Sequence, residues 1–259
     1  MKNNIKRKKF KALIIDCDGT LIANEMDAMP SPVVKQAIKS ASKLIHIGIA
    51  TQRPLFYSRA ILKHLNLSGP SIISGGAQVI DSKTLKILHE EKIRTEDLYE
   101  VIKIVKEFKK KYDLKFIIQD TDGLDSDYKE DYVPRKPIEA GIFSLEHQAA
   151  EELKDKLSKI KNLSVHKGVS WEIGRFGVVI THALATKQHG IFEVAKLLKI
   201  DTHEIIGVGD GYNDFPLLLA CGLKIAMSNA VPDLKEIADY IAPSVEDDGV
   251  ADVIKRFVL

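Results

Sequence analysis

The chain has 259 residues, which is long for one domain and enough for two at roughly 100–200 residues each. Lys and Arg total 38 against 36 for Asp and Glu, and a formal net charge of +2 argues against binding to nucleic acid through excess positive charge. The two cysteines, Cys17 and Cys221, could form one bridge at most, which argues against a secreted fold built on disulfides.

The first third of the chain alternates short apolar runs with segments of helical spacing, and so does the part after residue 186. Alternating strands and helices of this length indicate right-handed crossover connections and a mostly parallel sheet. The predicted strands are 11–15, 45–50, 71–73, 205–208, 223–226 and 240–242, and the predicted helices are 32–44, 55–65, 188–198, 213–220 and 231–238.

The middle of the chain has a different pattern with antiparallel signals. We expect strands at 78–81, 85–89, 115–119, 163–166, 169–173 and 177–181, and helices at 96–111 and 145–160. The predicted fold class is therefore α/β: a doubly wound, Rossmann-like parallel sheet core with an inserted α+β domain. Residues 1–81 and 186–259 form the predicted core, and residues 82–185 form the predicted insertion.

The amino terminus is rich in Lys and Arg, but it is not typical of a secretory signal. The apolar stretch behind residues 1–11 is broken at once by Asp16 and Asp18. No uninterrupted run approaches the ~20 apolar residues that span a bilayer. We expect a solvated tail on a cytoplasmic protein that binds neither membrane nor nucleic acid.

The strongest chemical signal is Asp16-Cys17-Asp18-Gly19-Thr20-Leu21, directly after the first predicted strand. In a doubly wound sheet, ligands bind outside the carboxyl ends of the strands, so both carboxylates fall where chemistry takes place. An aspartate there can attack phosphorus and form an aspartyl-phosphate. A second aspartate two residues later can protonate the leaving oxygen and then accept a proton from water.

A second acidic loop, Gly209-Asp210-Gly211-Tyr212-Asn213-Asp214, follows the predicted strand at 205–208. Mg²⁺ prefers hard oxygen ligands, and Asp210 and Asp214 can reach a common cation. Carboxylates that are brought together repel each other unless a cation lies between them. Asn213 can hydrogen-bond a phosphate oxygen.

Two further positions would complete a phosphate site. Thr51 follows the second predicted strand, and its hydroxyl and the backbone N–H groups after it, at Gln52 and beyond, can bind an oxyanion. Lys187 begins a predicted helix where the chain returns from the insertion, and an ammonium offers phosphate a compact charge. The predicted substrate-binding residues are Thr51, Gln52, Lys187 and Asn213.

Together, the segment 16–21, Thr51, Lys187 and the loop 209–214 resemble the four motifs of the haloacid dehalogenase (HAD) superfamily of phosphohydrolases. Residues 226–232, Ala-Met-Ser-Asn-Ala-Val-Pro, are similar to the ending of its Cof-type, sugar-phosphatase-like (IIB) branch. The interval between Thr51 and Lys187 is far longer than that between Asp16 and Thr51. The resemblance implies that residues 82–185 are a C2-type cap, of the B subtype.

The resemblance also implies a Mg²⁺-dependent phosphatase that acts on a small phosphorylated metabolite. Asp16 would attack phosphorus, Asp18 would serve as acid and base, and Mg²⁺ would be held by Asp16, the Asp18 carbonyl, Asp210 and Asp214. Three alternatives stay open: a phosphoglycolate-type phosphatase, a phosphotransferase or mutase with the same intermediate, and a regulator that binds phosphorylated ligands without catalysis. Neither the substrate nor the oligomeric state follows from the sequence.

Two positions depart from the family pattern. Gln52 stands where relatives commonly have glycine, and Gly75 stands where they often have asparagine, so one hydrogen bond to substrate is in doubt. Other polar groups are predicted to be unrelated to metal binding. His182 and His189 have no partner at metal-binding spacing, and the acidic segment 120–127 lacks the glycine and glutamate positions of an EF-hand.

Overall fold

The computed structural model describes residues 10–25, 27–121, 123–124, 136–170 and 172–259. Residues 1–9 of the predicted N-terminal tail (1–11) and half of the acidic segment 120–127 (122 and 125–127) lie outside these residues. The chain forms two compact units, Met1–His89 with Thr186–Leu259, and Glu90–Ala185. Residues 82–89 therefore group with the first unit, whereas the boundary predicted from the sequence lies after residue 81. Within the described residues, every helix is too short or too polar to serve as a membrane span.

The first unit is built on a five-stranded parallel sheet of order β13-β12-β11-β1-β2. Ile15 of β1 lies opposite Val208 of β11 and Ile49 of β2, so these three strands end at the same edge. Residues that follow the three strands therefore converge there. The strands are β1 (Ala12–Ile15), β2 (His46–Ile49), β11 (Ile205–Gly209), β12 (Leu223–Met227) and β13 (Tyr240–Ala242).

Helices cover both faces of this sheet, because alternate residues of the buried strands point to opposite sides. Leu13 and Ile15 pack with α1, α2 and α8 on one face, and Ala12 and Ile14 pack with α5, α6 and α7 on the other. The prediction of a doubly wound α/β core is confirmed. The helices are α1 (Pro32–Ala41), α2 (Leu55–Leu65), α5 (Lys187–Leu198), α6 (Phe215–Ala220), α7 (Pro232–Ile237) and α8 (Gly249–Phe257).

A three-stranded sheet of order β3-β4-β5 continues the first unit beside β2. A bridge between Ala50 and Ile72 joins it to the end of β2. Helix α5 lies against β3, and a Cβ at Gly190 would lie 2.8 Å from the Ile72 side chain, so glycine permits this close approach. The elements are β3 (Pro70–Ile73), η1 (Ser74–Gly76), β4 (Gln78–Asp81) and β5 (Ile87–Glu90), with η2 (Thr202–Glu204) and η3 (Tyr212–Asp214) elsewhere in the unit.

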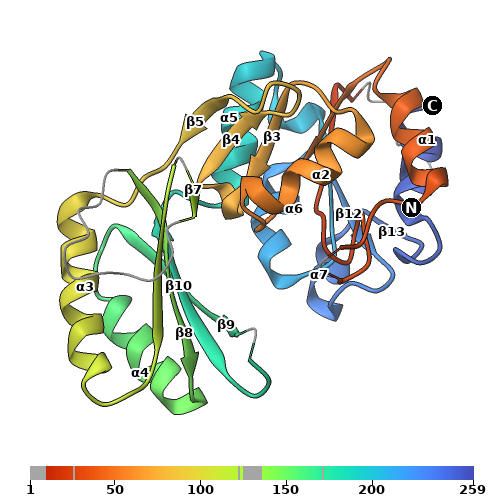
Figure 1. The fold of residues 1–259 in the computed structure, drawn as a ribbon. Coiled ribbons are helices and arrows are strands. Elements are labelled where there is room, and N and C mark those ends of the chain that lie inside the picture. The colour runs from red at the N-terminus through yellow and green to blue at the C-terminus, as the bar shows by residue number, and fades with distance from the viewer. Residues whose placement is uncertain (1–9, 26, 122, 125–135, 171) are drawn as a thin grey trace. The chain divides into compact units, whose positions relative to one another are not determined.

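The second unit has an antiparallel sheet of order β7-β6-β8-β10-β9. Helices α3 (Thr95–Lys109) and α4 (His147–Leu157) cover one face and share a separate apolar core with it (Figure 1). This confirms the predicted α+β character of the insertion. The strands are β6 (Lys115–Asp120), β7 (Gly123–Leu124), β8 (Pro137–Leu145), β9 (Leu163–Val169) and β10 (Phe176–His182).

Several stretches differ from the predicted elements. Strand β8 and helix α8 were not predicted, and both carry polar residues or glycine between their buried side chains. The strand predicted at 169–173 is wrong beyond Val169. The described residues 170 and 172–175 form a turn, in which Ser170 N–H donates to the Arg175 carbonyl at 2.9 Å and Gly174 has φ +75°.

Candidate active site

Asp16 is the first residue after β1 and lies at the carboxyl edge of the parallel sheet. Its backbone N–H donates to the carbonyl of Val208 at 2.9 Å, which extends the β1–β11 ladder past the end of the strand. The residue is 4% exposed. The sheet itself therefore fixes the backbone position of this residue.

The turn after β1 is closed by the N–H groups of Leu21 and Ile22, which donate to the Cys17 carbonyl at 2.8 and 3.0 Å. Gly19 has φ +80°, and a Cβ there would clash with the carboxylate of Asp210. Glycine is required on both counts. The early acidic loop and the late acidic loop thus pack directly against each other.

Two side chains that were not predicted as site residues connect the early loop to other segments: Thr20 bonds the late loop, and Asn229 bonds Gly19 and Val245. Thr20 Oγ1 donates to Asp210 Oδ1 at 2.9 Å. Asn229 Nδ2 donates to the Gly19 carbonyl at 2.8 Å, and Asn229 Oδ1 accepts the N–H of Val245. Thr20 belongs to the first motif, so it could have been named as a site residue from the sequence. Asn229 was quoted only as part of the family-like ending of the chain.

Lys187 is the first residue of α5, and Thr186 caps the helix by accepting the N–H of His189 at 3.1 Å. Its Nζ donates to Asp16 Oδ1 and to Asp214 Oδ1, both at 2.5 Å. The lysine is 1% exposed and Asp214 is fully buried. One buried ammonium therefore joins three segments that are far apart in the sequence.

The second carboxylate oxygen of Asp214 has backbone donors. Its Oδ2 accepts the N–H groups of Asp210 at 3.0 Å and Gly211 at 2.9 Å. Both oxygens of Asp214 are engaged by the protein. Asp214 therefore shapes the late loop in addition to being a candidate metal ligand.

The site concentrates negative charge. Carboxylate oxygens of Asp16, Asp210 and Asp214 lie within 4.8 Å of one another. Burial raises the pKa of Asp16 to about 8, with Lys187 opposing this rise and Asp214 adding to it. Burial also raises the pKa of Asp210 to about 6, against the hydrogen bond from Thr20. Burial disfavours the Lys187 ammonium, but the two aspartates that it binds raise its pKa above the ordinary value. Such a group of hard oxygens is suited to a divalent cation.

Asp18 is bound by Arg53, which the sequence did not predict as a site residue. Arg53 Nε donates to both carboxylate oxygens at 3.1 and 2.9 Å, and its Nη2 donates to Oδ1 at 2.5 Å. The Asp18 side chain is 32% exposed, against 6% for Asp16. A guanidinium that binds both oxygens fixes the plane of the carboxylate. The sequence did contain a clue to this contact, because Arg53 is a cation that lies two residues after Thr51, just past the end of a predicted strand.

Thr51 is buried where β2 and β3 meet. Its N–H donates to the Ile72 carbonyl at 3.0 Å, its carbonyl accepts the Gly75 N–H at 2.9 Å, and its Oγ1 accepts the Arg53 N–H at 3.0 Å. Gln52 is exposed. A Cβ at Gly75, where φ is +65°, would clash with the Gln52 amide. The two departures from the family pattern are thus in contact, because the Gln52 side chain fills the space that a side chain at 75 would need.

Asn213 lies on η3 and is exposed, with its Oδ1 beside Gly211. Some of the predicted site residues therefore contact one another directly, and others are connected through a residue between them. Asp16, Lys187, Asp210 and Asp214 form one cluster, and Arg53 connects Asp18 to Thr51. Gln52 extends from Thr51 toward Gly75, and Asn213 stands next to Asp214 in the late loop.

A family model described as haloacid dehalogenase-like hydrolase matches residues 13–254. The chain belongs to this family. The prediction of a HAD phosphohydrolase is confirmed, and with it the reaction class of a phosphoric monoester hydrolase.

Two relatives of this HAD-like hydrolase are 26% identical to it. One is the 5-amino-6-(5-phospho-D-ribitylamino)uracil phosphatase YcsE of Bacillus subtilis, and the match covers 96% of each chain. The other is the phosphoglycolate phosphatase of Methanopyrus kandleri, over 95% of this chain and 96% of the relative.

Solved structures share the fold over nearly the whole chain. The phosphatase BT1666 of Bacteroides thetaiotaomicron has a TM-score of 0.79 at 21% identity, and the match covers 99% of this chain and 98% of that one. The HAD subclass IIB sugar phosphatase BT4131 has a TM-score of 0.75 at 24% identity, with 95% and 98% covered.

Proposed function

We propose that this HAD-like hydrolase is a Mg²⁺-dependent phosphatase that acts on a small phosphorylated metabolite, with Asp16 as the nucleophile. The observation that carries the proposal is the buried cluster in which Lys187 binds Asp16 and Asp214 beside Asp210. A cluster of this kind places a nucleophile, a cation and additional carboxylates at the edge of the sheet where ligands bind.

The residues present fit Mg²⁺. Carboxylate oxygens are the hard donors that this ion prefers, and those of Asp16, Asp210 and Asp214 are close enough to share one cation. We propose these three and the Asp18 carbonyl as the ligands. When bound, Mg²⁺ would offset negative charge on the transferred phosphoryl group.

In the proposed reaction, a carboxylate oxygen of Asp16 attacks phosphorus while the bond to the leaving alcohol oxygen breaks. Asp18 donates its proton to that oxygen, and the product alcohol leaves. Asp18 then takes a proton from water, whose oxygen attacks the aspartyl-phosphate and releases inorganic phosphate. The contact with Arg53 holds the Asp18 carboxylate in one orientation.

The remaining predicted residues are proposed to bind the phosphoryl oxygens. Lys187 supplies a fixed positive charge next to Asp16. Thr51, the backbone at Gln52 and Asn213 supply hydrogen bonds from the ends of β2 and β11. Donors that are already in place stabilise charge in the transition state without reorganising.

The substrate class is proposed from the chemistry of the site and from the relatives. The names of the two relatives specify phosphate esters of small molecules. We therefore propose a sugar phosphate or a comparable small phosphate ester, with phosphoglycolate as the second candidate. We also propose that the insertion is a C2-type cap of the B subtype and that the enzyme acts in the cytoplasm.

The test is a phosphate-release screen over sugar phosphates, phosphoglycolate, nucleotides and pyridoxal phosphate, with and without Mg²⁺. Asp16→Asn should lower release by about a thousandfold or more, because the amide is not a nucleophile. Asp233→Asn, at an exposed aspartate on α7, is the matched control and should leave release unchanged.

Three outcomes would contradict the proposal. Undiminished release by Asp16→Asn would exclude Asp16 as nucleophile. Tight binding of a phosphate ester without release under Mg²⁺ would favour a regulator. Transfer of the phosphoryl group to an added sugar in preference to water would favour a phosphotransferase or mutase.

A further inference from the structure

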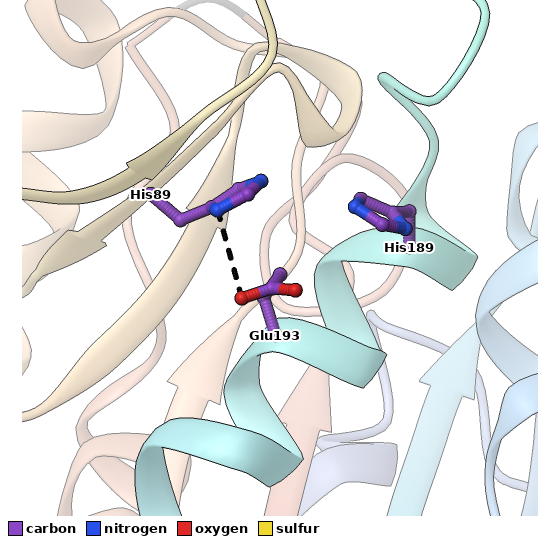
Figure 2. Close-up of side chains that lie close together, drawn as sticks. All are labelled: His89, His189 and Glu193. Carbon is purple, nitrogen blue, oxygen red and sulfur yellow. Dashed lines mark ion pairs between the residues drawn. The ribbon is translucent and has the colours of Figure 1, made fainter.

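A second group of possible metal ligands lies in the first unit and has no part in the proposed phosphatase reaction. His89 is on β5, and His189 and Glu193 are on α5. Their side chains point toward one another, with both imidazole rings above the carboxylate (Figure 2). One ligand atom from each residue lies within 4.8 Å of the other two.

The fold accounts for this convergence. His189 and Glu193 are four residues apart on α5, so they share one helix face and are neighbours on it. The Thr186 cap fixes the first turn of α5 by accepting the His189 N–H. His89 lies on a strand about a hundred residues earlier in the sequence, so sequence spacing could not show that it joins His189 and Glu193. Its Nδ1 lies 3.5 Å from Glu193 Oε2, and the two imidazole centroids are 5.6 Å apart.

From this geometry we infer that His89, His189 and Glu193 form a binding site for a borderline first-row divalent cation such as Zn²⁺. Two imidazoles and a carboxylate are the protein ligands of open zinc sites, in which water completes a tetrahedron. Zinc bonds of about 2.0–2.2 Å place ligand atoms about 3.4 Å apart, so small side-chain rotations close the site. The donor set differs in kind from the all-oxygen cluster at Asp16, and imidazole favours Zn²⁺ over Mg²⁺.

The site is accessible to an ion, and the nearby Lys196 ammonium competes only weakly for Glu193. The His89 side chain is 26% exposed and that of Glu193 is 15% exposed, so an ion can enter while the ligands are partly desolvated. Lys196 Nζ lies 3.3 Å from Glu193 Oε2, but its side chain is 76% exposed. An ion pair with so exposed a lysine contributes little. A simple His89–Glu193 ion pair is the competing explanation, and it requires no metal.

Binding here would connect β5 to the first turns of α5. His89 is the last residue of the first unit before the chain enters the insertion, and α5 begins just after the chain returns. An ion bound only by the folded state raises the melting temperature. We expect a rise of a few degrees at saturating Zn²⁺, independent of any phosphate ester.

The test is calorimetric titration of the full chain with Zn²⁺ in millimolar Mg²⁺, after treatment with a chelator that is then removed. We expect a zinc site that Mg²⁺ does not compete for. His89→Asn and His189→Asn should each weaken it at least tenfold, and Glu193→Gln should weaken it as well. His203→Asn, at an exposed histidine, should not change it. Asp210→Asn should also retain the site, which separates it from the acidic cluster.

X-ray absorption at the zinc edge should show two imidazole ligands in the wild type and one in His189→Asn. Circular dichroism verifies that each variant is folded, and His89→Asn on a different element replaces His189→Asn if the latter unfolds. Zinc affinity unchanged in both histidine variants, or no binding in millimolar Mg²⁺, would overturn the inference and leave the ion pair as the explanation. None of these readouts depends on phosphate release, so the proposed function can fail while this site stands.

Discussion

Asp16 and Glu139 are carboxylates associated with different sheets, the first buried and the second half-buried, and their surroundings differ. Asp16, at the edge of the parallel sheet, accepts a hydrogen bond from the buried Lys187 ammonium. Glu139 is half-buried on the antiparallel β8, opposite Gln119 and Thr181 on the neighbouring strands. Burial raises the pKa of Glu139 to about 7. Burial raises the pKa at both sites, but at the first the Lys187 ammonium opposes the rise, whereas at the second burial is the only cause.

The difference teaches how topology decides whether a buried carboxylate has a partner of opposite charge. The parallel sheet brings the ends of β1 and β11 and the start of α5 to one edge, so a lysine from one segment can meet aspartates from two others. In the antiparallel sheet, the register places uncharged side chains on both sides of Glu139. A buried carboxylate that retains an ammonium partner, as Asp16 does, is the better candidate for catalysis.

The largest effect is expected from Lys187→Met, which makes the first site resemble the second by removing its cation. Asp16 and Asp214 would then remain buried without the ammonium, and the free energy of unfolding should fall by about 3–5 kcal/mol. Urea denaturation followed by circular dichroism measures this. Lys196→Met, at an exposed lysine on the same helix, is the control and should change stability by less than about 0.5 kcal/mol. A Lys187→Met protein as stable as the control would show that the ammonium is not needed to hold these charges.

The next effect is a pH dependence at Glu139. Its carboxyl has a pKa of about 7 in the folded chain and an ordinary value of 4.5, so the folded state binds the proton more tightly. This stabilisation is fully present below about pH 4.5 and is lost as the pH rises through about 7. Relative to Glu139→Gln, the wild type should therefore lose up to about 3 kcal/mol of unfolding free energy across that window. Denaturation at pH 5, 6, 7 and 8, followed by the fluorescence of the single tryptophan, measures the difference. A difference that does not vary with pH would mean that Glu139 titrates as an exposed residue does.

The parts of the fold that could be predicted from sequence are those with a strong local pattern. Strand β1 is a continuous buried run, and α1 has Pro32 in its first turn after the capping Ser31, so both were found. Strand β8 was missed because Glu139 and Gly141 interrupt its buried side chains, Ile138, Ala140 and Ile142. Its identity as a strand depends on pairing with β6 and β10, and such long-range pairing cannot be read from a local window.

The candidate site divides in the same way. Asp16, Thr51 and Asp210 were predicted because each follows an apolar strand and because they stand in the order of the family's motifs. The bond from Arg53 to Asp18 and the packing of Gln52 against Gly75 were not predicted, because they depend on how separate loops meet. The same holds for His89 and His189, which only the folded chain brings together.

The smallest effect is expected at Asp18, whose carboxylate has a cation partner but is less buried than Asp16. Arg53→Lys keeps the charge and removes the planar contact with both oxygens. Because water screens a pair at this depth, the free energy of unfolding should fall by about 1 kcal/mol or less, and less still in 1 M salt. Arg59→Lys, at an exposed arginine on α2, gives the baseline for the same exchange. If Arg53→Lys lowered the free energy of unfolding as much as Lys187→Met does, the depth of burial would not determine how much a cation partner stabilises a carboxylate. The difference between Asp16 and Glu139 would then need another explanation.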